Sequence, residues 1–264
     1  MYADIIVSIV LAALLAFVTL KKKAFTPAAA ATACTILITA GICGSYAAIV
    51  IVLAAYGIVF AVDMVIGKRT EKITGEINRK TGTRDIVQVL ANGLAATVAL
   101  VIGKVFNSDI GIIVYASALT ECLADSLASD IGVLSRKDPV DICRMKRIKR
   151  GMSGGVSALG TLSALGGCLA MTLIAFAFWG FSLKYVVAIT LIPMLGILID
   201  SILGSLVQAK YVCSVCGKAT EKTNHCGQAT KHTGGITFIN NDTVNILSNI
   251  STAAIAAVYL LFLI

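Results

Sequence analysis

Eight long apolar stretches dominate this sequence and leave few folds open to it. About 20 apolar residues cross a hydrocarbon core of about 30 Å, so each stretch has the length of a membrane span. Hydrophobic residues make up 58% of the chain and charged residues only 14%, which excludes an ordinary soluble domain. Backbone polar groups must be satisfied inside lipid, so we expect these stretches to be helices. They cover residues 3–20, 27–43, 46–66, 86–105, 110–134, 156–178, 183–206 and 244–264.

We therefore predict an all-α polytopic membrane protein, a single integral membrane domain over residues 1–264 with about eight transmembrane helices. The loop charges are asymmetric: of 22 Lys and Arg residues, 20 fall at 21–23 and in the loops 67–85, 135–153 and 207–243. The positive-inside rule puts these loops in the cytoplasm and both termini outside. The net charge of +8 is then a topology signal and not a sign of nucleic-acid binding. The same loops also suit contacts with lipid headgroups or bound anions.

Apart from Asp4 near the N-terminus, five acidic residues occur within or at the ends of the apolar stretches, and burying each of them needs a physical reason. A carboxylate at mid-membrane costs roughly 2.5 to 3.5 kcal/mol on insertion scales. With the predicted orientation, four of the five lie toward the cytoplasmic ends of their spans and Glu121 lies nearer the middle. Several polar residues fall on the same side, so we predict a polar chamber that opens to the cytoplasm. The acids are Asp63, Glu121, Asp125, Asp130 and Asp200, and the other polar residues are Gln88, Asn92, Asn241, Asp242 and Asn245.

Two of these acids begin similar short motifs in the fifth and seventh spans. Asp125 is followed by Ser126 and Ser129, and Asp200 by Ser201. This similarity is consistent with a weak internal repeat. Carboxylates with neighbouring hydroxyls are the hard oxygen ligands that Mg²⁺ takes, usually together with substrate phosphates. The pattern therefore favours a magnesium site between two helices. The alternative is that the same residues only form hydrogen bonds between helices.

The third cytoplasmic loop ends in a basic, glycine-rich turn before the sixth span. Lys149 and Arg150 close a basic run, and Gly151, Ser153 and the pair Gly154-Gly155 follow. Glycines let the backbone approach a ligand closely, and a helix N-terminus attracts anions. The turn is typical of a phosphate cradle, although the Walker motif is absent. Otherwise it is a simple turn with a lipid-anchoring basic run.

Three of the eight cysteines cluster in the last cytoplasmic loop, residues 207–243. Cys213 and Cys216 form a C-x₂-C pair, and His225-Cys226 follows about ten residues later, with His232 further on. A cytoplasmic loop is reducing, so this spacing favours a structural, zinc-ribbon-like zinc site, with His225 or His232 as the fourth ligand. The alternative is a metal-free loop of reduced thiols. The scattered cysteines are interpreted as packing residues: Cys34, Cys43, Cys122, Cys143 and Cys168.

Together these motifs resemble a family of membrane proteins that includes transmembrane protein 19 of animals and the phytyl-phosphate kinase of chloroplasts. Met152 departs from the family's usual Thr, which puts a hydroxyl contact to phosphate in doubt, and alanine replaces a glycine usual after the Thr-Pro. The Asp-Ser helix paired with a basic Gly-Gly loop is also similar to membrane polyprenol kinases and cytidylyltransferases, which use CTP. The matching stretches are Phe25-Thr26-Pro27, Arg84 with 88–93, 124–132, 151–157 with 160–161, 200–205, the Cys/His loop and 241–245.

The resemblance implies a membrane-embedded kinase. Such a transferase would move the terminal phosphoryl group of a nucleoside triphosphate, CTP rather than ATP, to an isoprenoid (phytyl or prenyl) monophosphate. Asp125 and Asp200 would hold Mg²⁺ and act in catalysis with Lys149 and Arg150. The remaining chamber residues would bind the nucleotide and the lipid phosphate: Arg84, Gln88, Asn92, Ser126, Ser129, Asp130, Gly151, Ser153, Gly154, Gly155, Ser201, Asn241, Asp242 and Asn245.

Two other classes of function fit parts of the sequence. A transporter of a small or lipid-linked anion also uses membrane acids and repeats, but it needs polar groups reachable from both faces. Nearly all polar residues here crowd the cytoplasmic half. A non-catalytic lipid-binding or scaffold protein would keep the spans and the zinc loop without phosphoryl transfer.

Overall fold

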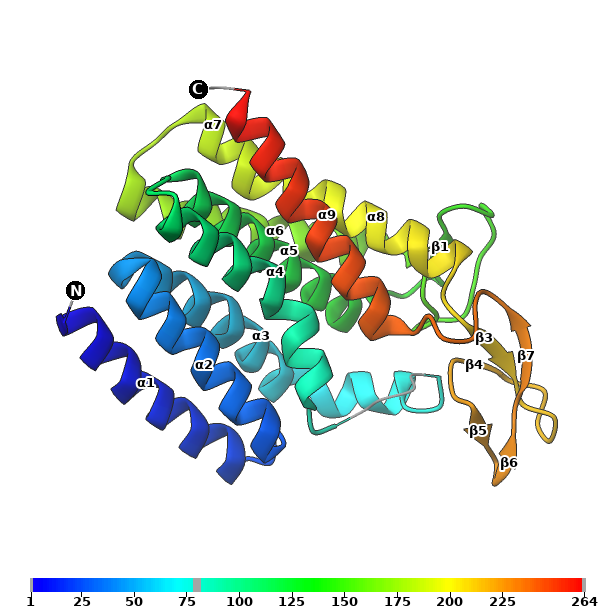
Figure 1. Ribbon diagram of the computed structural model, residues 1–264. Helices are drawn as coiled ribbons and strands as arrows, with labels where there is room; N and C mark the ends of the chain where they lie inside the picture. The colour runs from blue at the N-terminus through cyan, green and yellow to red at the C-terminus, as the bar shows by residue number, and fades with distance from the viewer. Residues whose placement is uncertain (1, 78–81, 263–264) are drawn as a thin grey trace.

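The computed structural model describes residues 2–77 and 82–262, and long helices make up most of it (Figure 1). Within this part, seven helical segments are long and apolar enough to span a membrane, and α2, with 17 residues, is a shorter apolar helix. The predicted all-α membrane fold with about eight spans is confirmed. The segments are α1 (Tyr2–Lys21), α2 (Pro27–Cys43), α3 (Ser45–Thr74), α4 (Ile86–Val105), α5 (Ile110–Gly132), α6 (Ala158–Trp179), α7 (Leu183–Val186) continued by the π-helical turn η1 (Val187–Leu191) and α8 (Ile192–Leu206), and α9 (Asn241–Leu261).

Side-chain caps fix where four of the helices begin. Thr26 accepts a hydrogen bond from the Ala29 N–H at the start of α2, with Pro27 in the first turn. Asp85 and Gln88 form a capping box at α4, and Ser157 and Asn240 cap α6 and α9. Each cap satisfies backbone donors that a helix leaves open at its N-terminus. These polar residues therefore define one end of the bundle.

Helix α5 is the centre of the bundle. Its most apolar window is 78% buried, whereas the corresponding windows of the other spanning segments are 17–33% buried. The helix packs against α3, α4, α6, α8 and α9. At the contact with α6, a Cβ added to Gly160 would lie 2.7 Å from the Ala128 carbonyl oxygen. Small residues thus let these helices approach closely.

Short strands form two small structures outside the bundle. In the loop between α5 and α6, β1 (Val140–Asp141) pairs antiparallel with β2 (Gly155–Val156). The loop between α8 and α9 contains a three-stranded sheet in the order β4-β3-β7 and a separate β5-β6 hairpin. Both structures lie at the end of the bundle opposite the two chain termini (Figure 1). The bounds are β3 (Lys210–Val212), β4 (Ala219–Thr220), β5 (Asn224–His225), β6 (Gln228–Ala229) and β7 (Lys231–Gly234).

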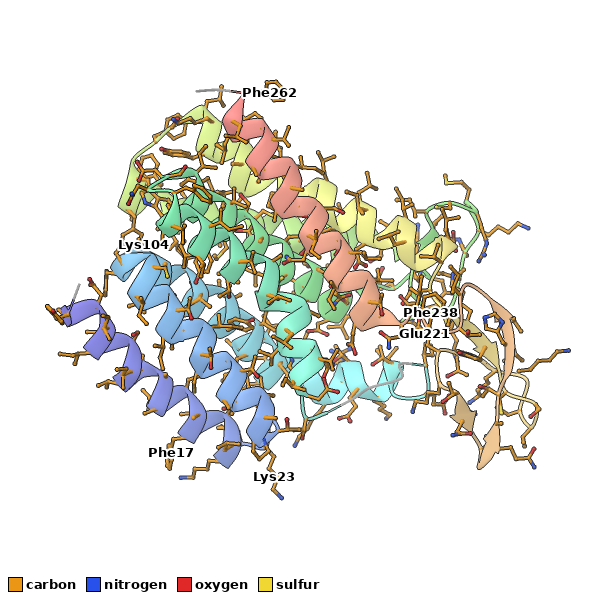
Figure 2. The ribbon with its side chains drawn as sticks, in the orientation of Figure 1. Phe17, Lys23, Lys104, Glu221, Phe238 and Phe262 are labelled. Carbon is orange, nitrogen blue, oxygen red and sulfur yellow. The ribbon has the colours of Figure 1, made fainter. Side chains whose placement is uncertain are left out.

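Hydrogen bonds join the basic loops at this end. The Thr83 hydroxyl donates to the Lys23 carbonyl oxygen over 2.7 Å, and the Glu221 N–H donates to the Ile77 carbonyl oxygen over 2.9 Å. Figure 2 shows Lys23 and Glu221 toward this end of the bundle and Lys104 at the other. The described basic residues of the four loops therefore gather at one end of the bundle. That this end faces the cytoplasm stays a prediction.

Three details differ from the sequence-based expectation. Helix α3 continues to Thr74 instead of ending at residue 66. The seventh span is interrupted by the π-helical turn η1, which the sequence did not predict. Cys143, expected to be a packing residue, is exposed.

Candidate functional site

A polar cavity of about 500 Å³ opens among the helices at the basic end of the bundle. Its walls come from α4, α5, α6 and α8, the N-terminus of α9, and the loop between α5 and α6. We call it the polar cavity. The predicted site residues that line it are Arg84, Gln88, Asn92, Asp125, Ser126, Ser129, Asp130, Arg150, Gly151, Ser153, Gly154, Gly155, Asp200, Ser201, Asn241, Asp242 and Asn245.

Asp125 and Asp200 reach this cavity from different helices, α5 and α8, which are 75 residues apart in the chain. Ser248 Oγ of α9 lies 3.3 Å from Asp200 Oδ2, within hydrogen-bond distance. Both carboxylates share the cavity wall with Gly154 of the glycine-rich loop. The two acids and the loop thus line one cavity, and their chemical roles stay predictions.

Glu121 does not belong to the lining that the structure describes. Its side chain is 2% exposed, and it accepts hydrogen bonds from Ser248 Oγ at 2.9 Å and Asn249 Nδ2 at 2.7 Å. These donors on α9 satisfy a polar group that would otherwise be costly to bury. Glu121 therefore joins α5 to α9. Asp63 is absent from the described lining of the polar cavity and lines a second cavity.

The glycine-rich loop packs directly on α8. Gly154 has φ +84°, and a Cβ there would lie 2.6 Å from the backbone N and Cα of Ser205. Only glycine fits both this conformation and this contact. The neighbouring Ser153 N–H donates to Glu221 Oε1 over 2.9 Å. One donor of the expected phosphate cradle is therefore already paired, and anion binding by this loop has to use other groups.

Two buried carboxylates that the sequence did not single out hold this loop in place. Glu221, 6% exposed, lies between the Ser153 N–H and Gln208 Nε2, which donates over 2.8 Å. Asp141 is fully buried and accepts hydrogen bonds from Ser205 Oγ at 2.6 Å and from two backbone N–H groups of the same loop. The loop is thus attached to α8 and to the Cys/His region.

The basic residues of the predicted site differ in how they are held. Arg150 Nη1 donates to the Ser135 carbonyl oxygen over 3.1 Å, and its Nε lies 3.5 Å from Asp138 Oδ1. Arg84 lines the polar cavity and is close enough to Asp130 for their charges to interact. Lys149, predicted as catalytic, is exposed and does not appear in the described lining. Arg84 and Arg150 are the cations best placed to face an anion in the cavity.

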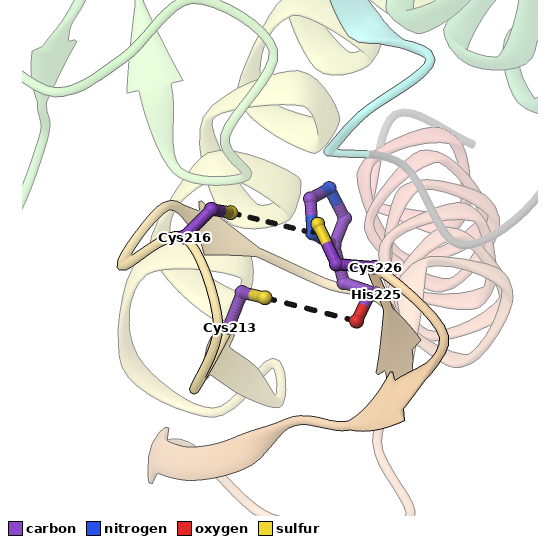
Figure 3. Close-up of side chains that lie close together, drawn as sticks. All are labelled: Cys213, Cys216, His225 and Cys226. Atoms are coloured by element: carbon purple, nitrogen blue, oxygen red, sulfur yellow. Dashed lines mark hydrogen bonds between the residues drawn. The ribbon is translucent and has the colours of Figure 1, made fainter.

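The three clustered cysteines and one histidine meet in the loop between α8 and α9. Figure 3 shows the four side chains directed toward one another, and their ligand atoms all lie within 4.8 Å of each other. His225 Nδ1 is 3.6 Å from Cys216 Sγ and 3.2 Å from Cys226 Sγ. Zinc bonds of about 2.3 Å to sulfur and 2.0–2.1 Å to nitrogen fit such spacing in a tetrahedron. The cluster can therefore hold a metal ion such as zinc.

The geometry also selects the histidine. His232 stacks edge-on against Tyr211, with ring centroids 5.4 Å apart, and is not part of the cluster. The Cys216 N–H opposes the effect of burial and, with smaller contributions from Val215 and His225, lowers the pKa of Cys213 to about 6. A thiolate is the form of cysteine that binds metal. The described ligand set is Cys213, Cys216, His225 and Cys226.

Comparison with known proteins agrees with this architecture. The model of the integral membrane protein family DUF92 matches residues 10–253. The chain belongs to this family. Protein PGR of Arabidopsis thaliana is 30% identical to this chain over 242 residues, which cover 78% of this chain and 82% of PGR.

A second relative matches a shorter segment. An uncharacterized membrane protein of Methanocaldococcus jannaschii is 28% identical over 127 residues, 48% of this chain and 52% of the archaeal protein. No solved structure matches this chain. Membership of DUF92 therefore establishes an integral membrane protein and names no reaction.

Proposed function

We propose that this DUF92 protein is a membrane-embedded kinase that transfers the terminal phosphoryl group of a nucleoside triphosphate, CTP in preference to ATP, to an isoprenoid monophosphate. One observation carries the proposal: Asp125 and Asp200, from two helices, line a single polar cavity with Gly154 of the glycine-rich loop. The resemblance of the motifs to the phytyl-phosphate kinase family supports the same reaction. The preference for CTP rests on the likeness to membrane polyprenol kinases.

The cavity suits a reaction that needs positioning more than a base. An acceptor phosphate oxygen bonds to the terminal phosphorus, the bond from that phosphorus to the bridging oxygen breaks, and the nucleoside diphosphate leaves. The acceptor oxygen is already anionic at neutral pH, so no proton has to be removed. Both histidines of the chain lie in the Cys/His loop, which agrees with a mechanism without a histidine base.

The residues divide into metal-binding and anion-binding groups. Asp125 and Asp200 would hold Mg²⁺, which neutralises phosphate charge when bound. Arg84 and Arg150 would face the phosphates, and Asn241 at the N-terminus of α9 lies where the helix dipole favours an anion. These contacts orient donor and acceptor within one cavity, which is the main contribution a protein makes to phosphoryl transfer.

The test is phosphoryl transfer by purified protein in nanodiscs with Mg²⁺, labelled CTP or ATP, and a panel of prenyl monophosphates. We expect a prenyl diphosphate from the parent and at least a hundredfold lower rate for Asp125→Asn and Asp200→Asn, about 2.7 kcal/mol of barrier. Asp109→Asn is the matched control, because Asp109 is exposed at the other end of α5. No product from any nucleotide and lipid, with folded protein, contradicts the proposal.

A transporter of an anionic substrate is the second candidate, and two observations favour it. The seventh span contains the π-helical turn Val187–Leu191, and irregular helices are common in transporters. Glu121 also lies buried within the bundle beside Asn249. Flux of a prenyl monophosphate or inorganic phosphate across liposomes without nucleotide, abolished by Glu121→Gln and unaffected by Asp109→Asn, would establish transport in place of phosphoryl transfer.

A further inference from the structure

A second cavity, of about 690 Å³, lies among α1, α2, α3 and the start of α4. Its volume is within the range of pockets that bind small organic ligands, about 300–1,000 Å³. Much of its wall is hydrocarbon, including Leu15 of α1, Leu37 of α2, and Val52, Leu53 and Phe60 of α3. We call it the groove. Its lining suits an apolar ligand better than a free nucleotide.

The groove is long as well as apolar. Its lining on α3 runs from Val52 to Thr74. These residues are 22 positions apart, which at 1.5 Å per residue is about 33 Å along the helix. That length is comparable to the hydrocarbon core of a bilayer. A groove of this shape suits an extended chain better than a compact molecule.

The two ends of the groove differ in polarity. At the end nearest the basic loops it is lined by Lys22, Lys23, Lys68 and Arg84, together with the carboxylates of Asp63, Glu71 and Asp130. Four cations and three acids leave a net charge of +1 in this lining, and pairing Arg84 with Asp130 does not change that sum. The groove thus combines a hydrocarbon wall with a cationic end, which matches an amphiphile that has an anionic head.

The groove adjoins the polar cavity. Thr74, Arg84, Gln88 and Asp130 line both spaces. The backbone of Arg84 is fixed at this junction by hydrogen bonds in both directions, from the Thr26 N–H at 3.0 Å and to the Ala24 carbonyl oxygen at 2.8 Å. A molecule in the groove that places its head beside Arg84 therefore has that head next to the polar cavity.

We propose that the groove binds the hydrocarbon tail of a phosphorylated lipid, with the phosphate at Arg84 and the chain lying along α3. This inference rests on the proposed function in one respect: that function makes the lipid phosphate the acceptor in the polar cavity. The groove would then set which chain lengths are accepted. Binding of the lipid itself requires neither nucleotide nor transfer.

Gly57 offers a way to fill the groove without disturbing the protein. It is an exposed residue of α3 that lines the groove, and a Cβ added there meets no atom within 4 Å. Glycine is also a poor helix former, so replacement does not weaken α3. Gly166 of α6 is the matched control, because it is likewise exposed and open but lies outside both described linings.

Gly57→Phe and Gly166→Phe are compared with a long-chain prenyl monophosphate and with a monophosphate of a single isoprene unit. We expect Gly57→Phe to raise KM for the long acceptor at least tenfold. The phenyl ring would displace about two methylene groups of the lipid chain from the groove, and the lost burial corresponds to a change of that size. KM for the nucleotide and for the short acceptor, which does not extend along α3, should stay within twofold of the parent. Gly166→Phe should leave all three values unchanged.

A second measurement separates the groove from the reaction. A prenyl monophosphate with a photoreactive group at its tail is crosslinked to nucleotide-free protein, and the labelled peptides are mapped. Labels in α1, α2 or α3 that fall at least fivefold in Gly57→Phe support the groove even if no phosphoryl transfer is found. Labels confined to other helices, with Gly57→Phe kinetically like Gly166→Phe in an active enzyme, overturn the groove and leave the proposed function standing.

Discussion

Asp141 shows how a single buried carboxylate fixes the loop that faces the polar cavity. Burial by itself would raise its pKa, but the Ser205 hydroxyl, the Arg144 and Cys143 N–H groups and the Lys210 ammonium outweigh burial. The pKa of Asp141 is therefore held below its ordinary value of 3.8. A depressed pKa contributes stability that is present at neutral pH and is lost as pH falls through the depressed value. Asp141 should thus matter most above about pH 4.

We predict that Asp141→Asn lowers the free energy of unfolding at pH 7 by about 2 kcal/mol, because a charge-assisted hydrogen-bond network loses its acceptor charge. Thermal unfolding in detergent at pH 7 and pH 3 checks this, since the difference between parent and variant should shrink at pH 3. Asp138→Asn is the control, because Asp138 is 56% exposed and pairs only with Arg150 at 3.5 Å among the described ion pairs. A loss of equal size at both pH values would contradict the role of charge.

The same residues show where sequence reasoning ends. Asp125 and Asp200 could be found because a carboxylate inside an apolar stretch is expensive and therefore conspicuous. Asp141 and Glu221 lie in polar loops, where nothing distinguishes one carboxylate from another. Their partners, Ser205 and Ser153, are 64 and 68 residues away. Only the folded chain brings such pairs together.

At the scale of the elements, the Cys/His loop is attached to the glycine-rich loop by Glu221. Desolvation raises the pKa of Glu221, although the Ser153 hydroxyl and N–H, Lys210 and Gln208 oppose this shift. Thr220, which precedes it, is fully buried and its hydroxyl donates to the Ile77 carbonyl oxygen over 3.1 Å. The strand β4 contains only Ala219 and Thr220, and Glu221 follows it. Because this strand is short, a metal ion in the cluster would hold the region in place more firmly than β4 alone.

We predict that removing the metal loosens this region and the glycine-rich loop, and leaves the helices intact. Cys213→Ser, or treatment with a strong chelator, should increase amide hydrogen exchange at least tenfold in residues 210–234 and also at 151–155. Exchange in the central part of α5 should stay unchanged. Cys43→Ser, a change of the same chemistry in α2, is the control. Unchanged exchange at 151–155 after metal loss would contradict the coupling through Glu221.

Helix starts were predicted only in part. The expected starts of α2 and α4, residues 27 and 86, agree with the structure and follow the capping residues Thr26 and Asp85. Helices α6 and α9 begin after their caps at Ala158 and Asn241, instead of at residues 156 and 244. The expected span ends near residue 66, where the apolar pattern stops, whereas α3 continues through a charged segment to Thr74. Lys, Arg and Glu are good helix formers in water, so loss of hydrophobicity does not end a helix.

At the scale of the whole molecule, the fold gathers chemistry at one end. The polar cavity, the charged end of the groove and the metal-binding cluster all lie on the side of the four basic loops. The eight apolar stretches and their charge bias were enough to predict this polarity of the bundle. The Asp-Ser motifs of the fifth and seventh spans led us to expect a site between these two helices, and α5 and α8 both line the polar cavity. The other helix neighbours could not be predicted, since apolar spans carry little information on which neighbours they choose.

The orientation of this polarised molecule in the membrane is open to a direct experiment. We predict that the basic end faces the cytoplasm and that both termini lie outside. Cys143 is exposed at the basic end, and Lys104 is exposed near the end of α4 at the opposite face. A membrane-impermeant thiol reagent should label Cys143 only after cells are permeabilised, with Cys143→Ser identifying its signal. In that background, Lys104→Cys should be labelled in intact cells. The reverse labelling pattern would show that the topology is inverted and that the polar cavity faces the outside. Cytoplasmic nucleoside triphosphates are absent there, so this result would also contradict the kinase proposal.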